Sequence, residues 1–140
     1  MTEPVEPTPA QLEAFAGADQ SAPVCMVNLL KFRDRAEYPD GRDAGGLSGR
    51  DAYGLYGAVA MKKIAEVGGR FLWGAPCEMT FVGDGRDDWD MIAIVYYPSR
   101  AAFLRMVAMP DYLEASEHRR AGLARTALIQ CPGNIAQFAQ

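Results

Sequence analysis

Few side chains in this sequence can move protons near neutral pH. His118, in the stretch EHRR, is the single histidine, and histidine is the side chain best suited to that task. Tyr53 and Tyr56 belong to an apolar stripe with helical spacing, where a hydroxyl either orients a ligand or remains a satisfied polar group of the core. His118 is either a proton carrier or a surface residue of a helix. We take His118 and Tyr53 as the candidate catalytic residues.

Two further polar residues belong to one apolar segment, VCMVNLLKFR over 24–33. Asn28 interrupts this segment, and a buried amide must form hydrogen bonds, either with backbone or water or with a bound ligand. Arg33 ends the segment, and it either holds a carboxylate through two parallel hydrogen bonds or pairs with acidic neighbours. Asn28, Arg33 and Tyr56 are therefore candidate ligand-binding residues.

Metal and cofactor chemistry has no support in the sequence. Cys25, Cys77 and Cys131 lie far apart without a C-x-x-C pair, and no histidine completes a zinc set, so we interpret them as reduced thiols. The stretch GDGRDDWD lacks the order of a calcium loop. The glycine-rich GRDAGGLSGR lacks a phosphate-binding motif and is interpreted as a mobile loop or lid. We expect no metal and no cofactor.

Length and charge set the class of protein. A chain of 140 residues fits one domain with its own core. The net charge of −4 and the lack of a long Lys/Arg run argue against nucleic-acid binding. The N-terminus does not have the pattern of a signal peptide, and no apolar run reaches the length that crosses a bilayer. These features predict a cytoplasmic protein whose partners include neither nucleic acid nor membrane.

Apolar periodicity and caps predict the order of the elements. We expect residues 1–20 to be a loose tail followed by a short helix capped by Thr8, and residues 21–140 to form one domain. Proline at position 76 marks the second strand as an edge. The expected elements are strands at 24–33, 71–82, 89–98 and 124–131, a helix from Ser48 or Asp51 to Val67, and a helix from Ser99 that is interrupted by Pro110.

The order βαββαβ defines a ferredoxin-like α+β fold, a four-stranded antiparallel sheet with two helices on one face. In that topology the first and third strands are central, and these are the two strands that are apolar on both faces. On the first strand, Cys25, Val27 and Leu29 form the second apolar face. Because two helices cover only one face, the other needs a cover, and a second copy of the sheet is the simplest. We expect a homodimer with an interface of roughly 1,600 Å².

Several stretches resemble one known family. MVNLLKFR, the GGR after the first long helix, WDMIAIVYYPS and PDY are together similar to the bacterial domain of unknown function family 1330, across residues 24–131. The resemblance implies a dimeric α/β barrel, in which two ferredoxin-like protomers pack sheet to sheet. Related barrels include cofactor-independent monooxygenases, haem-degrading enzymes and isomerases, and some place an Asn, a Trp and a His around the ligand. The resemblance therefore adds Trp73 and Trp89 to the ligand-binding candidates, beside Asn28 and His118.

Two classes of function remain open. The first is a cofactor-independent enzyme, monooxygenase-like or isomerase-like, that acts on a small aromatic or apolar substrate in a cavity of each protomer. The second is a non-catalytic small-molecule-binding or stress-associated dimer that uses the same cavity. A well-formed cavity lined by Trp, Tyr and one titratable group favours the enzyme, whereas a filled core favours the second class.

Overall fold

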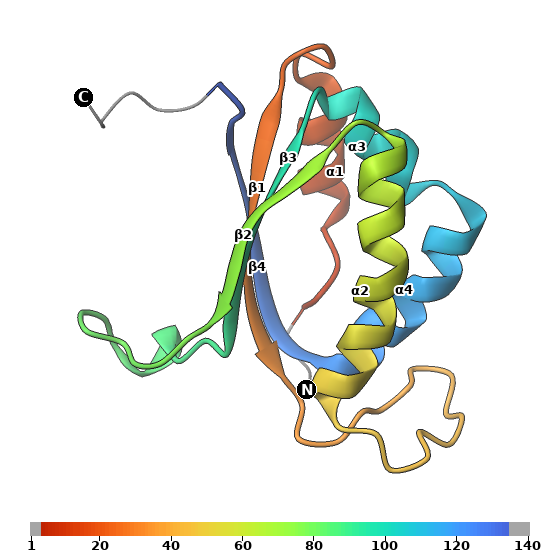
Figure 1. The fold of residues 1–140 in the computed structure, drawn as a ribbon, viewed down its shortest axis with the longest axis vertical. Coiled ribbons are helices and arrows are strands. Elements are labelled where there is room, and N and C mark those ends of the chain that lie inside the picture. The colour runs from red at the N-terminus through yellow and green to blue at the C-terminus, as the bar shows by residue number, and fades with distance from the viewer. Residues whose placement is uncertain (1–3, 135–140) are drawn as a thin grey trace.

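A four-stranded antiparallel sheet forms the centre of the molecule, and the helices lie against one of its faces (Figure 1). This computed structural model describes residues 4–134. The strands are β1 (Val24–Phe32), β2 (Arg70–Pro76), β3 (Met91–Tyr97) and β4 (Leu123–Pro132). Their order in the sheet is β2-β3-β1-β4, so β1 and β3 are central, as predicted.

Three of the four helices begin where the sequence supplies a side-chain cap. The helices are α1 (Pro9–Gly17), α2 (Gly49–Glu66), α3 (Arg100–Val107) and α4 (Pro110–Gly122), with a short 3-10 turn, η1, at Gly85–Asp87. The hydroxyls of Thr8, Ser48 and Ser99 accept hydrogen bonds from backbone N–H groups of the first turns. Pro110 begins α4 and separates it from α3, as predicted. No helix within residues 4–134 has the length and hydropathy of a membrane span.

The core lies between the sheet and the helices. On β1 the alternate residues Val24, Met26 and Leu30 point towards the helices and are almost fully buried. They pack in clusters that include Ile64 of α2 and Met106 of α3. Successive side chains of a strand point to opposite faces, so Asn28, between Met26 and Leu30, lies on this face as well. An amide therefore stands on the core side of a central strand.

Two glycines bring the ends of α2 and α4 against the end of β1. A Cβ at Gly49 would collide with the backbone of Arg33, and one at Gly122 would collide with the carbonyl of Gly49. The N–H of Arg33 donates to the Gly122 carbonyl at 2.8 Å, and the Arg33 carbonyl accepts from the Gly49 N–H at 3.0 Å. Only a residue without a Cβ permits this approach. These contacts fix the start of α2 and hence the position of Tyr53 in its second turn.

The leading segment packs against the helices and the sheet. Phe15 of α1 meets Phe103 edge to face at a centroid distance of 5.4 Å. Val5 packs on a buried apolar cluster, and Glu6 pairs with Arg119 at 3.1 Å. The expected tail thus makes contacts through Val5 and Glu6, whose partners include residues from the far end of the sequence. Residues 1–3 of that tail and residues 135–140 of the expected domain lie outside the described residues.

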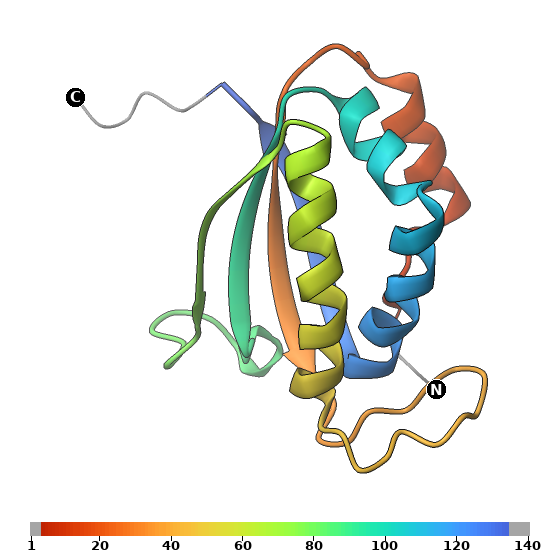
Figure 2. The same cartoon turned by 45° about the vertical axis from the view of Figure 1, so that its right-hand side comes forward.

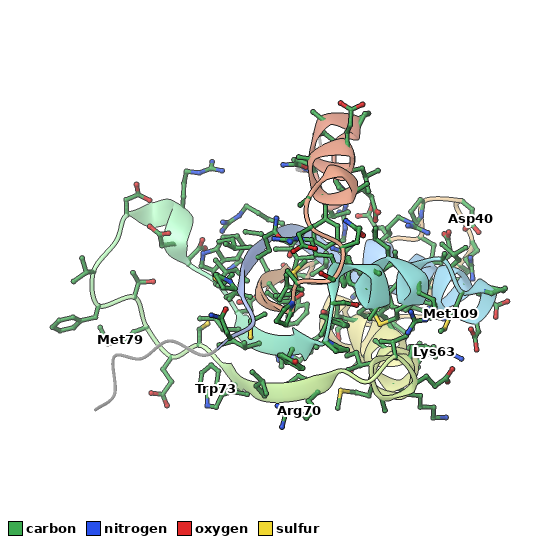
Figure 3. The ribbon with its side chains drawn as sticks, turned by 90° about the horizontal axis from the view of Figure 1, so that it is seen from above. Asp40, Lys63, Arg70, Trp73, Met79 and Met109 are labelled. Atoms are coloured by element: carbon green, nitrogen blue, oxygen red, sulfur yellow. The ribbon has the colours of Figure 1, made fainter. Side chains whose placement is uncertain are left out.

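The second strand is shorter than predicted. The apolar alternation continues to Val82, but β2 ends at Pro76, and the last bond to the neighbouring segment is that of the Cys77 N–H to the Asp90 carbonyl at 2.9 Å. Residues 77–90 form a loop that projects from the sheet on the side away from the helices (Figure 1). Met79 projects with this loop (Figure 3), and Phe81 at its tip is 90% exposed. The apolar pattern thus marks an exposed tip and not the end of a strand.

The other face of the sheet is apolar, and no helix of the described part of the chain covers it (Figure 2). We call it the open face. The register of the four strands places charged residues at the ends of this face, Lys31 opposite Arg125 and Arg70 opposite Tyr96. Its other side chains are Cys25, Val27, Leu29, Trp73, Ala75, Ile92, Ile94, Tyr96, Ala127, Ile129 and Cys131. Trp73 is 53% and Ile129 is 50% exposed. The second apolar face that the sequence indicated for the central strands therefore extends across all four strands.

Candidate functional site

Four tyrosines meet between the sheet and the helices, and we call them the tyrosine cluster. They are Tyr53 and Tyr56 of α2, Tyr97 of β3 and Tyr112 of α4. The ring centroids of Tyr53 and Tyr56 are 5.2 Å apart, and those of Tyr56 and Tyr112 are 5.7 Å apart. The hydroxyls of Tyr56 and Tyr112 share a hydrogen bond of 2.6 Å. Three elements that are distant in the sequence thus bring phenol groups into one place.

Simple periodicities explain how these side chains converge. Tyr53 and Tyr56 are three residues apart and so lie on one face of α2. Tyr97 stands opposite Val24 across the antiparallel ladder and therefore points towards the helices, as Val24 does. Tyr112 follows the start of α4 by two residues and joins the same buried cluster as Tyr97. The sheet supplies one phenol and the two longest helices supply the other three.

Two hydroxyls of the tyrosine cluster, those of Tyr53 and Tyr97, have no hydrogen-bond partner among residues 4–134. In this part of the chain the only fully enclosed side-chain polar atom that lacks a partner is Nε of Arg33. Both hydroxyls are therefore accessible to a group the size of a water molecule. Buried hydroxyls are nearly always hydrogen-bonded. The hydroxyls of Tyr53 and Tyr97 can therefore each form a hydrogen bond with water or with a small ligand.

Burial controls the ionisation of the tyrosine cluster. Removal from water raises the pKa of all four tyrosines above the ordinary value of a phenol. Neighbouring phenols raise the pKa of Tyr53, Tyr97 and Tyr112 further. The charge of Arg119 acts in the opposite direction on Tyr53 and Tyr112, with a smaller effect. At neutral pH these side chains stay protonated, so they can donate hydrogen bonds but are poor bases.

Arg119 connects the tyrosine cluster to the N-terminal segment. Its Nη1 donates to the carbonyl of Val5 at 2.7 Å and pairs with a carboxylate oxygen of Glu6 at 3.1 Å. Val5 also packs in one apolar cluster with Tyr53 and Leu30. Val5 and Glu6 therefore lie beside the site, and the carboxylate of Glu6 pairs with the guanidinium of Arg119.

Asn28 lies on the same face of the sheet, between the two buried clusters that contain these tyrosines. Its neighbour Met26 packs with Tyr97 and Tyr112, and its neighbour Leu30 packs with Tyr53. The side-chain Nδ2 donates to the carbonyl of Ala93 at 3.2 Å and, less favourably, to that of Met26 at 3.4 Å. The sequence left two interpretations of Asn28 open, hydrogen bonds with backbone or water and a contact with a ligand. The amide nitrogen fits the first of them, because it donates to backbone carbonyls.

His118 is not at the tyrosine cluster. Its Nδ1 lies 2.6 Å from the hydroxyl of Tyr38, and the two rings meet edge to face. Tyr38 belongs to a separate buried cluster with Ala52 and Ala121, beneath the loop at residues 34–48. Among the described residues, no contact joins His118 to Tyr53. The two candidate catalytic residues therefore have different aromatic partners, since the ring of Tyr53 contacts those of Phe32 and Tyr56.

Arg33 also lies outside the cluster. It follows β1 and points towards the loop, where its Nη1 is 3.9 Å from a carboxylate oxygen of Glu37. This distance fits a weak ion pair with an acidic neighbour, which was one of the two interpretations of Arg33.

The two tryptophans belong to other surfaces. Trp73 lies on the open face, away from the helices (Figure 3). Trp89 stacks under the guanidinium of Arg125 at 4.2 Å, beside a hollow of about 350 Å³ that also borders Pro4. A second hollow, of about 430 Å³, lies within the loop around Tyr38. Neither hollow borders the tyrosine cluster, so the structure does not gather the predicted Trp, Asn and His around one cavity.

Sequence reasoning missed three residues of this site. They are Tyr97, Tyr112 and Arg119. Tyr112 and Arg119 gave no signal by spacing, because their approach depends on the packing of α4 against α2. Tyr97 lies two residues after Val95 on β3 and therefore points to the same face of the sheet. Because Val95 faces the core, this spacing could have placed Tyr97 in the core. Among residues 4–134, no three His, Cys, Asp or Glu side chains gather in a way that would hold a metal ion.

Comparison with known proteins identifies near and distant relatives. The family model described as domain of unknown function (DUF1330) matches residues 47–131. The RPA0582 protein of unknown function from Rhodopseudomonas palustris is 32% identical, with a TM-score of 0.85, over 97% of this chain and 100% of that one. Its methylated form is 34% identical, with a TM-score of 0.89, over the whole of both chains. No curated protein matches the sequence.

Two more distant structures share the fold. SnoaB, a cofactor-independent oxygenase from Streptomyces nogalater, is 15% identical, with a TM-score of 0.52, over 84% of this chain and 99% of that one. A dimeric protein of unknown function with a ferredoxin-like fold, from Bacteroides fragilis, is 10% identical, with a TM-score of 0.51, over 79% and 95%. The predicted ferredoxin-like α+β fold is thereby confirmed, with four helices in place of two.

Proposed function

This chain belongs to the family of domains of unknown function called DUF1330, and we propose that it is a cytoplasmic homodimer that binds a small aromatic molecule carrying a hydroxyl or carbonyl oxygen. The ligand lies at the tyrosine cluster of each protomer. The free hydroxyls of Tyr53 and Tyr97 carry this proposal, because they offer hydrogen bonds that no described protein group accepts. The surrounding rings supply the apolar contacts that an aromatic ligand needs.

The dimer rests on the open face. An apolar sheet face in water is a site of association, because covering it removes apolar area from solvent. The exposed tip of the loop at 77–90 adds Met79, Phe81 and Val82 on the same side of the molecule. The distant relative from Bacteroides fragilis is described as dimeric. A second copy of this chain is therefore the proposed cover.

Tyr53→Phe tests the binding site without removing its ring. The Tyr53 hydroxyl has no partner among the described residues, so we expect the variant to keep the stability of the wild type. Phenol is the probe, because it is a small aromatic molecule with one hydroxyl. We expect wild-type protein to bind phenol more tightly than benzene, and the variant to lose about tenfold in phenol affinity, the equivalent of one hydrogen bond. Titration followed by NMR measures both affinities.

Tyr56→Phe is the matched control for this experiment. It removes the same hydroxyl group from the same helix, but breaks the hydrogen bond to Tyr112. We expect it to lower the free energy of unfolding by about 1 kcal/mol while phenol still binds more tightly than benzene. Equal phenol affinities in wild type and Tyr53→Phe would contradict the proposed site.

Asn28→Leu separates a structural role from a ligand contact. Because Nδ2 bonds to backbone carbonyls, we expect the substitution to lower the free energy of unfolding by about 1–3 kcal/mol and to leave phenol affinity nearly unchanged. Urea unfolding and the same NMR titration measure the two effects. Unchanged stability together with lost phenol binding would instead show that Asn28 orients the ligand.

A cofactor-independent enzyme is the second candidate function. It is favoured by the fold shared with SnoaB, a cofactor-independent oxygenase, and by the charge of Arg119 beside phenol donors, which together can stabilise negative charge on a substrate oxygen. Because the tyrosines stay protonated, they cannot accept a proton from the substrate. The substrate must therefore be one that loses its proton easily. Consumption of dissolved oxygen with 1-naphthol as substrate tests this function. Binding without oxygen consumption supports the non-catalytic protein.

A further inference from the structure

The long connection between β2 and β3, residues 77–90, carries an apolar tip, and we call it the arm. It is far longer than the roughly two to five residues that join the strands of most hairpins. Met79, Phe81 and Val82 at its tip are 74%, 90% and 85% exposed. Single apolar side chains on a surface are ordinary, but three together on one projection are typical of a surface that another body covers.

Hydrogen bonds within the arm hold its tip in place. The carboxylate oxygens of Asp84 and Asp87 cap the turn η1, accepting from the N–H of Arg86 at 2.8 Å and from that of Asp84 at 3.1 Å. The hydroxyl of Thr80, beside Phe81, donates to the Asp87 carbonyl at 2.7 Å. A contact made by a preformed loop costs less conformational entropy than one made by a flexible chain. The arm therefore offers its apolar tip in a preformed arrangement.

The base of the arm is tied to one end of the open face. One carboxylate oxygen of Asp88 lies 3.2 Å from Nζ of Lys31, and the other accepts a hydrogen bond from the guanidinium of Arg125. Arg125 also donates to the carbonyl of Arg86 at 2.7 Å. Lys31 and Arg125 stand opposite each other on β1 and β4, at the end of the open face. The arm and the open face are therefore continuous on one side of the molecule (Figure 1).

The charge of the arm restricts the kind of partner that it can meet. The arm contains one basic side chain, Arg86, and five acidic ones, Glu78, Asp84, Asp87, Asp88 and Asp90. Nucleic acid and anionic lipid headgroups are negatively charged, so they would be repelled. A second copy of this chain that covers the open face must lie beside the arm, because the arm projects on that side (Figure 1). The second copy is therefore the partner that fits.

We propose that the tip of each arm packs on the partner protomer and clamps the homodimer. This inference rests on the homodimer of the proposed function and assigns the arm a contact of its own, beyond that between the two open faces. In a twofold dimer the same contact forms twice, once from each arm. A change of Phe81 therefore removes two buried rings from each dimer. Burial of each ring strengthens association by about tenfold or more.

Phe81→Ser tests this contact in the full-length protein by sedimentation equilibrium. Phe81 is almost fully exposed in one protomer, so the fold should persist. We expect the dissociation constant of the dimer to rise by about 100-fold, because both rings are lost. Met61→Ser is the matched control, since Met61 is also exposed but lies on α2, on the helical side of the molecule. It should leave the dissociation constant unchanged.

Chymotrypsin cleavage after Phe81 is a second measurement, and it leaves the arm unchanged. We expect cleavage to be about tenfold or more slower in the wild-type dimer than in protomers separated by Ile129→Arg, which places a charge on the open face. Equal cleavage rates, or a Phe81→Ser variant that associates as tightly as the wild type, would overturn the arm contact and leave the dimer standing. A wild-type protein that sediments as a monomer would overturn both.

Discussion

Ile129→Arg is expected to convert the homodimer into folded monomers. Ile129 lies on the open face of the edge strand β4 and is 50% exposed in one protomer, so the protomer itself loses little when the side chain changes. In the dimer the arginine would be an unpaired charge between two apolar sheets. Such a charge costs about 3 kcal/mol or more, which weakens association about 100-fold. Sedimentation equilibrium at micromolar concentration measures the change.

Leu55→Arg is the matched control for this prediction. Leu55 is 46% exposed on α2, on the other side of the molecule from the open face, so the same charge should leave the dimer intact. Circular dichroism should show wild-type secondary structure in both variants. A wild-type protein that sediments as a folded monomer, or two variants that associate equally well, would contradict the proposed interface.

Above about pH 10 the protein is expected to lose stability steeply. The folded state raises the pKa of all four tyrosines of the cluster, chiefly because it buries them. In the unfolded chain these phenols ionise near their ordinary pKa, so the unfolded state gains stability there and the folded state does not. The stabilisation is complete below that pH and falls as the pH rises further. The slope is about 1.4 kcal/mol per pH unit for each tyrosine.

Urea unfolding at neutral and alkaline pH, with tyrosinate absorbance as a second probe, measures this loss. Tyr97→Phe is the matched variant, because its hydroxyl has no partner among the described residues. It should keep wild-type stability at neutral pH and lose stability less steeply in alkali. Ionisation of all six tyrosines near their ordinary pKa while the fold persists would show that the cluster is not buried.

The fold was predictable because each step depended on local patterns. Two-sided apolar strands identified β1 and β3 as central, and the capping hydroxyls of Thr8, Ser48 and Ser99 marked three helix starts. The predicted end of β2 was wrong, because the alternation of side chains along the sequence continues past Pro76 into an exposed loop. The alternation shows which residues point to the same side, but it does not show where the neighbouring strand β3, which begins at Met91, ceases to be available for pairing.

The candidate site was predictable only in part. Helical spacing placed Tyr53 and Tyr56 on one face of α2, and the structure holds them together. His118 entered the prediction by residue type and Trp73 through the family resemblance, and packing placed them on other surfaces. Tyr112 depends on how α4 crosses α2, a contact between distant segments that local periodicity does not encode.

The position of a bound 4-bromophenol tests the central claim most directly, because anomalous scattering from bromine locates the ligand in a crystal without prior assumption. We expect the bromine signal between the sheet and the helices, with the phenol oxygen within hydrogen-bond distance of the Tyr53 or Tyr97 hydroxyl. We also expect the signal to be lost in crystals of Tyr53→Phe soaked in the same way. A signal confined to the hollow beside Trp89, or to the loop around Tyr38, would contradict the assignment of the tyrosine cluster as the binding site.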